Sequence, residues 1–149
     1  MKDLTVRTSI EIAANAARVW QVLTQPEFTR QYMFGSETVS DWKQGSALEW
    51  RGVHEGKAVV FVKGTVTKIE PPHVLHYTTF GPTEGYPDVP ANYMTVTYDV
   101  KPKGEGVELA VTQGNFATRT DGTGEKHFEG GEAGWQDLLE QIKALAEKR

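Results

Sequence analysis

Apolar and polar residues alternate along most of this chain, and helical spacing replaces the alternation in three segments. Residues 4–12 alternate over much of their length and predict a half-buried first strand. Residues 13–24 then switch to helical spacing, and Asn15 is placed to cap this helix. Pro26 suits the first turn of a second short helix, with Tyr32 on its buried face. The N-terminal part therefore predicts one strand followed by two short helices.

Between residues 36 and 116 the period becomes two, which predicts five or six strands joined by turns. We expect first a strand pair, interrupted at Gly45, that carries Trp42, Leu48, Trp50 and Val53. Four further strands follow, at residues 57–69, 73–80, 92–100 and 107–116. Short turns between successive strands favour antiparallel pairing. Gly64 lies inside the longest strand, where glycine often marks a bulge or a sharp bend. The segment therefore predicts an antiparallel meander with a place to curve.

The last predicted strand runs into a long helix. Beyond a Gly- and Thr-rich turn, apolar residues recur at helical spacing: Phe128, Trp135, Leu138, Leu139, Ile142 and Leu145. A sheet followed by one closing helix must bury its apolar face on that helix, and a long twisted sheet tends to curl. A curled sheet does not meet the helix everywhere, so a cavity opens between them. We expect one α+β domain over residues 1–149, with about six curved antiparallel strands around the C-terminal helix.

Aromatic residues on the strands and the closing helix are the best lead to function. A pocket needs apolar walls and a few placed polar groups, and Tyr77, Tyr98 and Gln113 could supply the latter. The predicted ligand-binding residues are Trp50, Phe61, Tyr77, Met94, Tyr98, Gln113 and Trp135. The alternative is that each aromatic side chain is simply part of the core. A one-residue slip in strand register would reverse every inward assignment.

Residues 81–90 hold three prolines and two glycines and form a loop longer than a hairpin needs. Tyr86 and Val89 are its apolar members. The loop is either a lid over one end of the cavity or an ordinary surface connection.

Composition excludes several classes of protein. The chain has 149 residues, no cysteine and a formal net charge of −4. Without cysteine there are no disulfides and no thiolate chemistry, which is compatible with a cytoplasmic protein. No segment approaches the roughly 20 apolar residues of a membrane span, and no basic stripe marks a nucleic-acid interface. The pattern favours no particular oligomeric state.

Candidate catalytic groups all have a simpler interpretation. His73 and His76 are three residues apart on a predicted strand, so they face opposite sides of the sheet. Glu125, Glu129 and Glu132 crowd the start of the last helix, where negative charge complements the helix dipole. No nucleophile elbow, phosphate loop or dinucleotide fingerprint occurs. We therefore predict no catalytic residue, no metal site and no cofactor.

Several motifs, in chain order, resemble the Bet v 1/START-like (SRPBCC) superfamily, and within it the branch of the activator of Hsp90 ATPase homologue. The motifs are Val19-Trp20-x-Val22-Leu23-Thr24-x-Pro26-Glu27 followed by Tyr32, then Trp42-x-x-Gly45, then Gly64-x-Val66-x-x-Ile69-x-Pro71-Pro72-x-x-Leu75-x-Tyr77, and Gly134-Trp135-x-x-Leu138-Leu139. The chain departs from many relatives at Ala13-Ala14-Asn15-Ala16, where a proline is common, and at Tyr32, which replaces a tryptophan. The resemblance implies a helix-grip fold with a cavity between sheet and helix.

The resemblance leaves three functional hypotheses. The first is a binding protein for a small hydrophobic ligand, such as a lipid or an aromatic, polyketide-like metabolite. The second is a cyclase- or aromatase-like enzyme that uses the same cavity. The third is a stress- or chaperone-associated interaction module, which predicts an exposed apolar patch. The Hsp90 co-chaperone itself carries a separate N-terminal domain that is missing from this sequence, so we disfavour an Hsp90-type chaperone as the partner.

Overall fold

The computed structural model describes residues 3–33, 35–120 and 122–148. Within these residues the chain forms strands, α-helices and two short 3₁₀ helices. In chain order they are β1 (Val6–Ile12), α1 (Ala16–Thr24), α2 (Pro26–Tyr32), β2 (Glu37–Ser40), β3 (Ala47–His54), β4 (Lys57–Glu70), β5 (Val74–Thr79), η1 (Pro90–Asn92), β6 (Met94–Lys103), β7 (Gly106–Gly114), η2 (Phe116–Thr118) and α3 (Gly124–Glu147).

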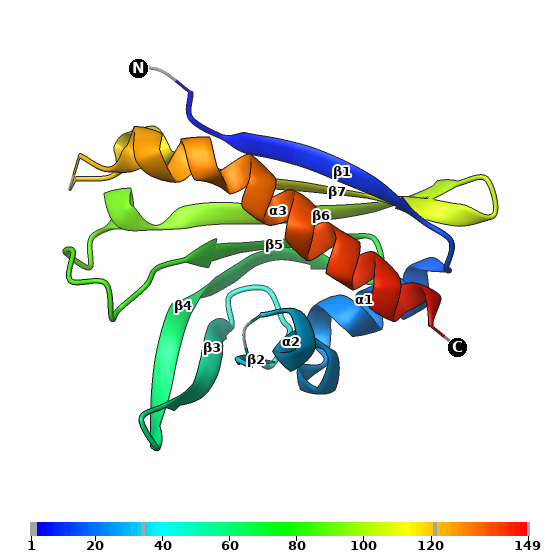
Figure 1. The fold of residues 1–149 in the computed structure, drawn as a ribbon, viewed down its shortest axis with the longest axis horizontal. Helices are drawn as coiled ribbons and strands as arrows, with labels where there is room; N and C mark the ends of the chain where they lie inside the picture. The colour runs from blue at the N-terminus through cyan, green and yellow to red at the C-terminus, as the bar shows by residue number, and fades with distance from the viewer. Residues whose placement is uncertain (1–2, 34, 121, 149) are drawn as a thin grey trace.

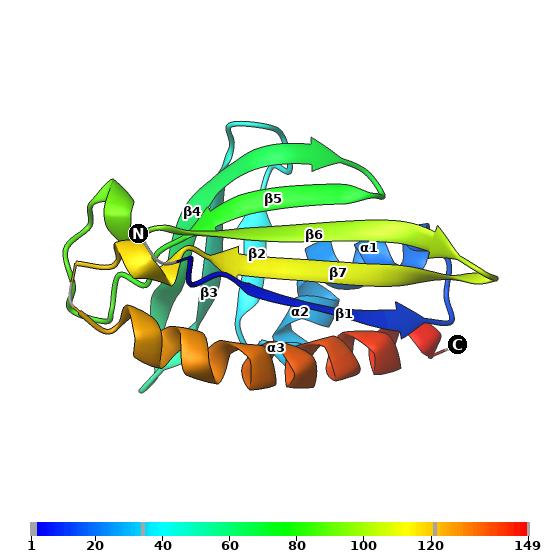
Figure 2. The same ribbon diagram turned by 90° about the horizontal axis from the view of Figure 1, so that it is seen from above.

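One antiparallel sheet contains all seven described strands, in the order β1-β7-β6-β5-β4-β3-β2. Helix α3 crosses one face of this sheet, α1 lies near the C-terminus, and α2 lies between α1 and β2 (Figure 1). Viewed from above, α3 runs alongside β1 (Figure 2). This is the helix-grip fold that the resemblance implied, with β2 as a short additional strand at one edge.

The inward rows predicted for β6 and β7 are confirmed. Their side chains are all buried: Met94, Val96, Tyr98 and Val100 on β6, and Val107, Leu109 and Val111 on β7. Because strand side chains alternate between faces, these rows form one apolar surface beneath α3.

Helix α3 presents a buried stripe to that surface, made of Trp135, Leu139, Ile142 and Ala146. Near its start the helix passes very close to β1. A Cβ atom added to Gly131 would lie 2.7 Å from Cγ2 of Val6. Glycine at this position lets helix and strand approach.

The two short helices begin as predicted, and α1 holds the C-terminal end of α3. The side chain of Asn15 accepts a hydrogen bond from the backbone N–H of Arg18 at 2.8 Å, and α2 begins at Pro26, so both predicted helix signals are confirmed. The Arg18 guanidinium donates to the carbonyl oxygens of Leu145 at 3.1 Å and Ala146 at 3.4 Å. Its positive charge therefore lies at the C-terminus of α3, where the helix dipole favours a cation.

Gly64 lies where β4 crosses closest to β5. A Cβ atom there would fall 1.7 Å from the carbonyl oxygen of Thr78, which leaves no space for any side chain. The next residue, Thr65, donates its backbone N–H to the Thr78 hydroxyl at 3.0 Å. The β4–β5 register also shifts just beyond, between Val66 and Lys68. The predicted irregularity at Gly64 is therefore a close backbone approach beside a bulge.

The prediction that Trp42 lies on a strand is wrong. Trp42 lies in the connection between β2 and β3 with a φ of 55°, and the strand before the turn is Glu37–Ser40. The Trp42 side chain packs against the core from this turn. An apolar residue that reaches the core from a left-handed turn has the same pattern as a strand residue, which explains the error.

Candidate ligand-binding site

A cavity of about 380 Å³ lies between the inner face of the sheet and the first half of α3. Five of the seven predicted ligand-binding residues line it: Trp50, Tyr77, Met94, Gln113 and Trp135. They come from β3, β5, β6, β7 and α3, so the tertiary fold brings together side chains that are far apart in sequence. The volume falls within the range of about 300–1,000 Å³ that is usual for small-molecule sites.

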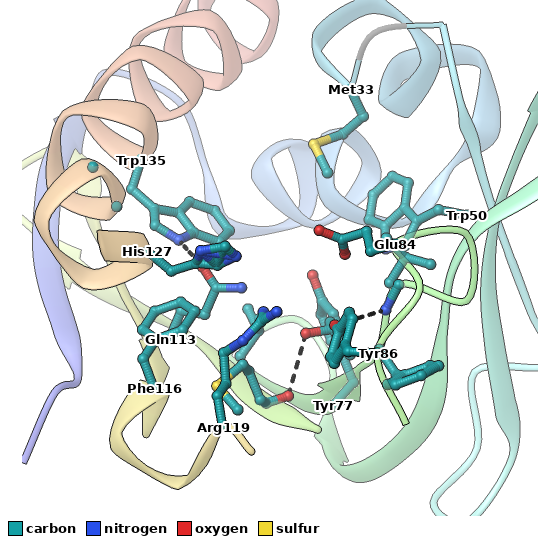
Figure 3. A pocket seen from close by; sticks show the side chains of 18 residues that line it. Met33, Trp50, Tyr77, Glu84, Tyr86, Gln113, Phe116, Arg119, His127 and Trp135 are labelled. Atoms are coloured by element: carbon teal, nitrogen blue, oxygen red, sulfur yellow. Dashed lines mark hydrogen bonds between the residues drawn. The ribbon is translucent and has the colours of Figure 1, made fainter. Parts of the chain in front are cut away.

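One hydrogen bond joins the helix wall of the cavity to its sheet wall. The indole N–H of Trp135 donates to Oε1 of Gln113 at 2.8 Å. Figure 3 shows Gln113 reaching toward the centre of the cavity beside Trp135. Because its oxygen accepts from Trp135, the orientation of the amide is set, and its NH₂ group is the part that can serve a ligand.

Two predicted residues do not line this cavity. Tyr98 is buried behind the wall, where its ring meets Trp135 edge-on at 5.8 Å between centroids and Tyr77 at 6.2 Å. Phe61 lines a second, neighbouring cavity with Met33 and Trp50. Tyr98 therefore supports the wall.

The buried tyrosines are neutral hydrogen-bonding groups. Burial raises the pKa of Tyr77, although a hydrogen bond from Tyr98 opposes the shift, and burial also raises the pKa of Tyr98 and of Tyr32. A phenol in such surroundings does not ionise near neutral pH. These hydroxyl groups are therefore poorly suited to act as general bases.

Three charged or ionisable side chains at the mouth of the cavity, Glu84, Arg119 and His127, were not predicted to line it, whereas Tyr86 belongs to the loop considered as a lid. Glu84 and Tyr86 from the 81–89 loop, Arg119 after η2, and His127 on α3 all line the cavity. The Arg119 guanidinium carbon lies 4.1 Å from the centroid of the Tyr86 ring, a cation–π contact that joins the two loops. Strand periodicity carries no signal for these residues, because they lie on loops and at a helix start.

The 81–89 loop is anchored beside this mouth. Asp88 accepts hydrogen bonds from Nζ of Lys63 at 2.6 Å and from the hydroxyl of Tyr93 at 2.7 Å. These two donors hold the pKa of the Asp88 carboxyl below its usual range. Tyr86 packs against Phe80, with 4.9 Å between the ring centroids. The loop thus brings an aromatic side chain to the cavity, and its role as a lid stays a prediction.

Among the residues that the structure describes, no group of three or more His, Cys, Asp or Glu side chains could hold a metal ion. His73 lies in the turn before β5, and its Nδ1 is 3.0 Å from the carbonyl oxygen of Val100 on β6. His76 lies on β5 beside the inward Tyr77 and so faces the other side of the sheet. Glu125 lies in the first turn of α3, as predicted.

The structure bears on both the membrane segment and the apolar patch considered from the sequence. Over the described residues, no helix is long and apolar enough to span a membrane. The exposed large apolar residues of the same part of the chain are Val39, Val53 and Val89. They lie on β2, on β3 and in the 81–89 loop. Val39 pairs with Glu49, four residues along β3 from Val53, so these two exposed side chains are not neighbours.

A curved antiparallel sheet that grips a C-terminal helix around a lined cavity defines a helix-grip protein of the SRPBCC type. The family model of "activator of Hsp90 ATPase homolog 1-like protein" matches residues 13–147. The chain therefore belongs to the activator of Hsp90 ATPase homolog 1-like family. No curated protein matches the sequence.

Solved structures agree with this assignment. ChR145 from Cytophaga hutchinsonii shares 36% identity with the chain at a TM-score of 0.79, over 99% of this chain and 97% of that one. DynU16, a putative protein in the dynemicin biosynthetic locus, has a TM-score of 0.72 at 18% identity, over 99% of this chain and 48% of its own. The Aha1 dimer from Colwellia psychrerythraea has a TM-score of 0.70 at 16% identity, over 96% of each chain. The last two likenesses concern the fold alone.

Proposed function

We propose that this protein binds a small hydrophobic ligand, a lipid or an aromatic, polyketide-like metabolite, between the sheet and α3. The observation that carries the proposal is the cavity of about 380 Å³ with Trp50, Met94 and Trp135 in its walls. Burial of apolar ligand surface would supply affinity at roughly 25 cal/mol per Å². The Gln113 amide would orient the ligand, because a pocket with few polar groups uses them for specificity.

Fluorine NMR of protein labelled with 5-fluorotryptophan tests this proposal directly. Trp50 and Trp135 line the cavity, whereas Trp20 and Trp42 do not and serve as internal controls. Titration with decanoate and with 2-naphthol should shift the Trp50 and Trp135 signals in a saturable manner for at least one compound. No shift with either compound, or equal shifts of all four signals, would count against an internal site.

A pair of glycine variants on α3 sharpens the test. A Cβ atom at Gly130 or at Gly134 would meet nothing within 4 Å, so a side chain can leave the helix at either position without a clash at its first atom. Gly130 lines the cavity and Gly134 does not. Gly130→Leu should weaken binding of the responding compound at least tenfold, whereas Gly134→Leu should leave it unchanged. Equal effects of the two substitutions would contradict the assignment of the site.

A cyclase- or aromatase-like activity is the second candidate, because ionisable groups reach the same cavity. Glu84 and His127 line it together with Arg119. A cavity that holds a reactive chain in one conformation supplies orientation, and an imidazole or carboxylate beside it supplies proton transfer. The substrate class would be a flexible poly-β-keto chain, and His127 is the first candidate for the proton-transfer group.

Turnover of a linear poly-β-keto thioester, followed by mass spectrometry, tests this second candidate. His127→Gln should abolish cyclisation while decanoate still binds, and the exposed His54→Gln should behave as wild type. A wild-type protein that forms no more cyclised product than buffer alone would remove this candidate and leave the binding proposal standing.

A further inference from the structure

A second cavity adjoins the first beneath the β3–β4 pair. It measures about 350 Å³ and is lined by Met33, Ser36, Trp50, Phe61 and Val62. Met33, Trp50 and Val62 also line the main cavity. These three side chains therefore form the boundary that the two spaces share. Met33 is the most adaptable part of this partition, because a thioether chain with three rotatable bonds repacks easily.

A β-bulge places Phe61 in the wall of the second cavity. Trp50 pairs with Val62 and Arg51 pairs with Val60, so Phe61 is an extra residue in β4. A bulge re-aims the side chain that it carries, and Phe61 consequently lines a cavity with Val62, its neighbour in sequence. Gly52 makes space for the ring, since a Cβ atom there would lie 2.8 Å from Cε2 of Phe61.

The two cavities differ in their polar groups. Ser36 is the polar side chain of the second cavity, and its hydroxyl donates to the carbonyl oxygen of Met33 at 2.6 Å. In Figure 3, Met33 and Trp50 lie across the main cavity from Gln113 and His127. Glu84 lies beside Trp50 in the same view, so the main cavity carries hydrogen-bonding groups on both sides, whereas the second cavity is the apolar part of the combined space.

We propose that the two cavities form one continuous site for an amphipathic ligand with an unbranched alkyl tail. This inference rests on the proposed binding function. The tail occupies the second cavity beside Phe61, passing the Met33 side chain. The oxygen-bearing head of the ligand lies in the main cavity, within reach of the Gln113 amide. A compact ligand fills the main cavity alone. The dependence of affinity on the length of the alkyl tail therefore distinguishes a two-cavity site from a single cavity.

A series of n-alkanoates from hexanoate to dodecanoate, titrated by calorimetry, tests the inference. Each buried methylene should raise affinity about fourfold until the second cavity is full. Phe61→Trp narrows this cavity and should make the rise stop at a shorter chain. Phe61→Ala widens it and should move the limit to a longer chain. Phe28 is partly buried and lines neither cavity, so Phe28→Trp is the matched control and should keep the wild-type limit.

The outcomes separate this inference from the proposed function. If hexanoate binds and the chain-length limit is the same in wild type and both Phe61 variants, the tail does not enter the second cavity and the inference is wrong. If no alkanoate and no aromatic compound binds the wild-type protein, the proposed function fails and the inference with it. Because the two Phe61 substitutions act in opposite directions, misfolding of one variant leaves the other to decide the question.

Discussion

The hydrogen bond between Trp135 and Gln113 should contribute measurably to stability, because it closes the cavity wall. Trp135 is only 7% exposed, and its indole N–H donates to Gln113 Oε1 at 2.8 Å. Gln113→Leu removes the acceptor and leaves a nearly buried donor without its partner, which typically costs about 1–3 kcal/mol. The cavity can admit water to the donor, so we expect the lower part of this range, about 1–2 kcal/mol.

Urea unfolding of Gln113→Leu, Trp135→Phe and the double variant measures this interaction. A change of 1 kcal/mol shifts Tm by roughly 2–4 °C in a protein of this size, so thermal unfolding provides a second readout. Trp135→Phe also loses part of the edge contact with Tyr98. The double-mutant cycle removes that additional loss and should leave a coupling energy of about 1 kcal/mol.

The control for this experiment is Gln31→Leu, another glutamine substitution in the same protein. Gln31 is exposed on α2, and substitutions of this kind usually change stability by less than about 0.5 kcal/mol. The cycle compares the losses of unfolding free energy in Gln113→Leu and Trp135→Phe with the loss in the double variant. If the two losses simply add, within the roughly 0.3–0.5 kcal/mol scatter of independent sites, the bond does not couple helix and sheet and the reasoning fails.

Two further predictions concern the sheet and the loop. Gly64→Ala should cost at least about 3 kcal/mol of unfolding free energy, because its Cβ would lie 1.7 Å from the Thr78 carbonyl oxygen. Gly134→Ala, in open space on α3, should instead gain about 0.5–1 kcal/mol, and equal effects in urea unfolding would contradict the packing argument. Asp88→Asn should increase the mobility of the 81–89 loop in amide NMR relaxation, because it weakens the contact with Lys63. The wild-type loop should loosen in the same way at acid pH. The folded-state pKa of Asp88 is lowered, so the stabilisation is present above the ordinary aspartate pKa and is lost as pH falls through the lowered value. An unchanged loop in both experiments would show that the ion pair does not hold it.

Much of the fold could be predicted because periodicity reports burial directly. The rows from Met94 to Val100 and from Val107 to Val111 alternate in the sequence and are buried in the structure. Asn15 and Pro26 mark helix starts through local backbone chemistry, which needs no tertiary information. Trp42 was misplaced, because periodicity cannot distinguish a strand residue from an apolar residue in a turn that packs on the same core.

The candidate site was only partly visible in the sequence. Strand alternation pointed inward at Tyr77, Met94 and Gln113, and these side chains do line the cavity. Strand alternation gave Phe61 and Tyr77 the same cavity. A bulge adds one residue to β4 at Phe61 and interrupts the period, so Phe61 lines the second cavity instead. Arg119 was missed as a lining residue, because a loop carries no period from which the direction of a side chain could be predicted. His127 lies in the first turn of α3 and was read only as part of a helix start.

The sequence by itself determined the order of the elements, the apolar face of the sheet and the need for a covering helix. These follow from local propensities and from the free energy of burying apolar surface. Only the tertiary structure decided how far apart sheet and helix stand, and therefore that a cavity of about 380 Å³ remains between them. That distance depends on long-range contacts, such as Gly131 against Val6 and Trp135 against Gln113. Pairs of residues more than 20 positions apart leave no period in the sequence, so their meeting had to be seen in the fold.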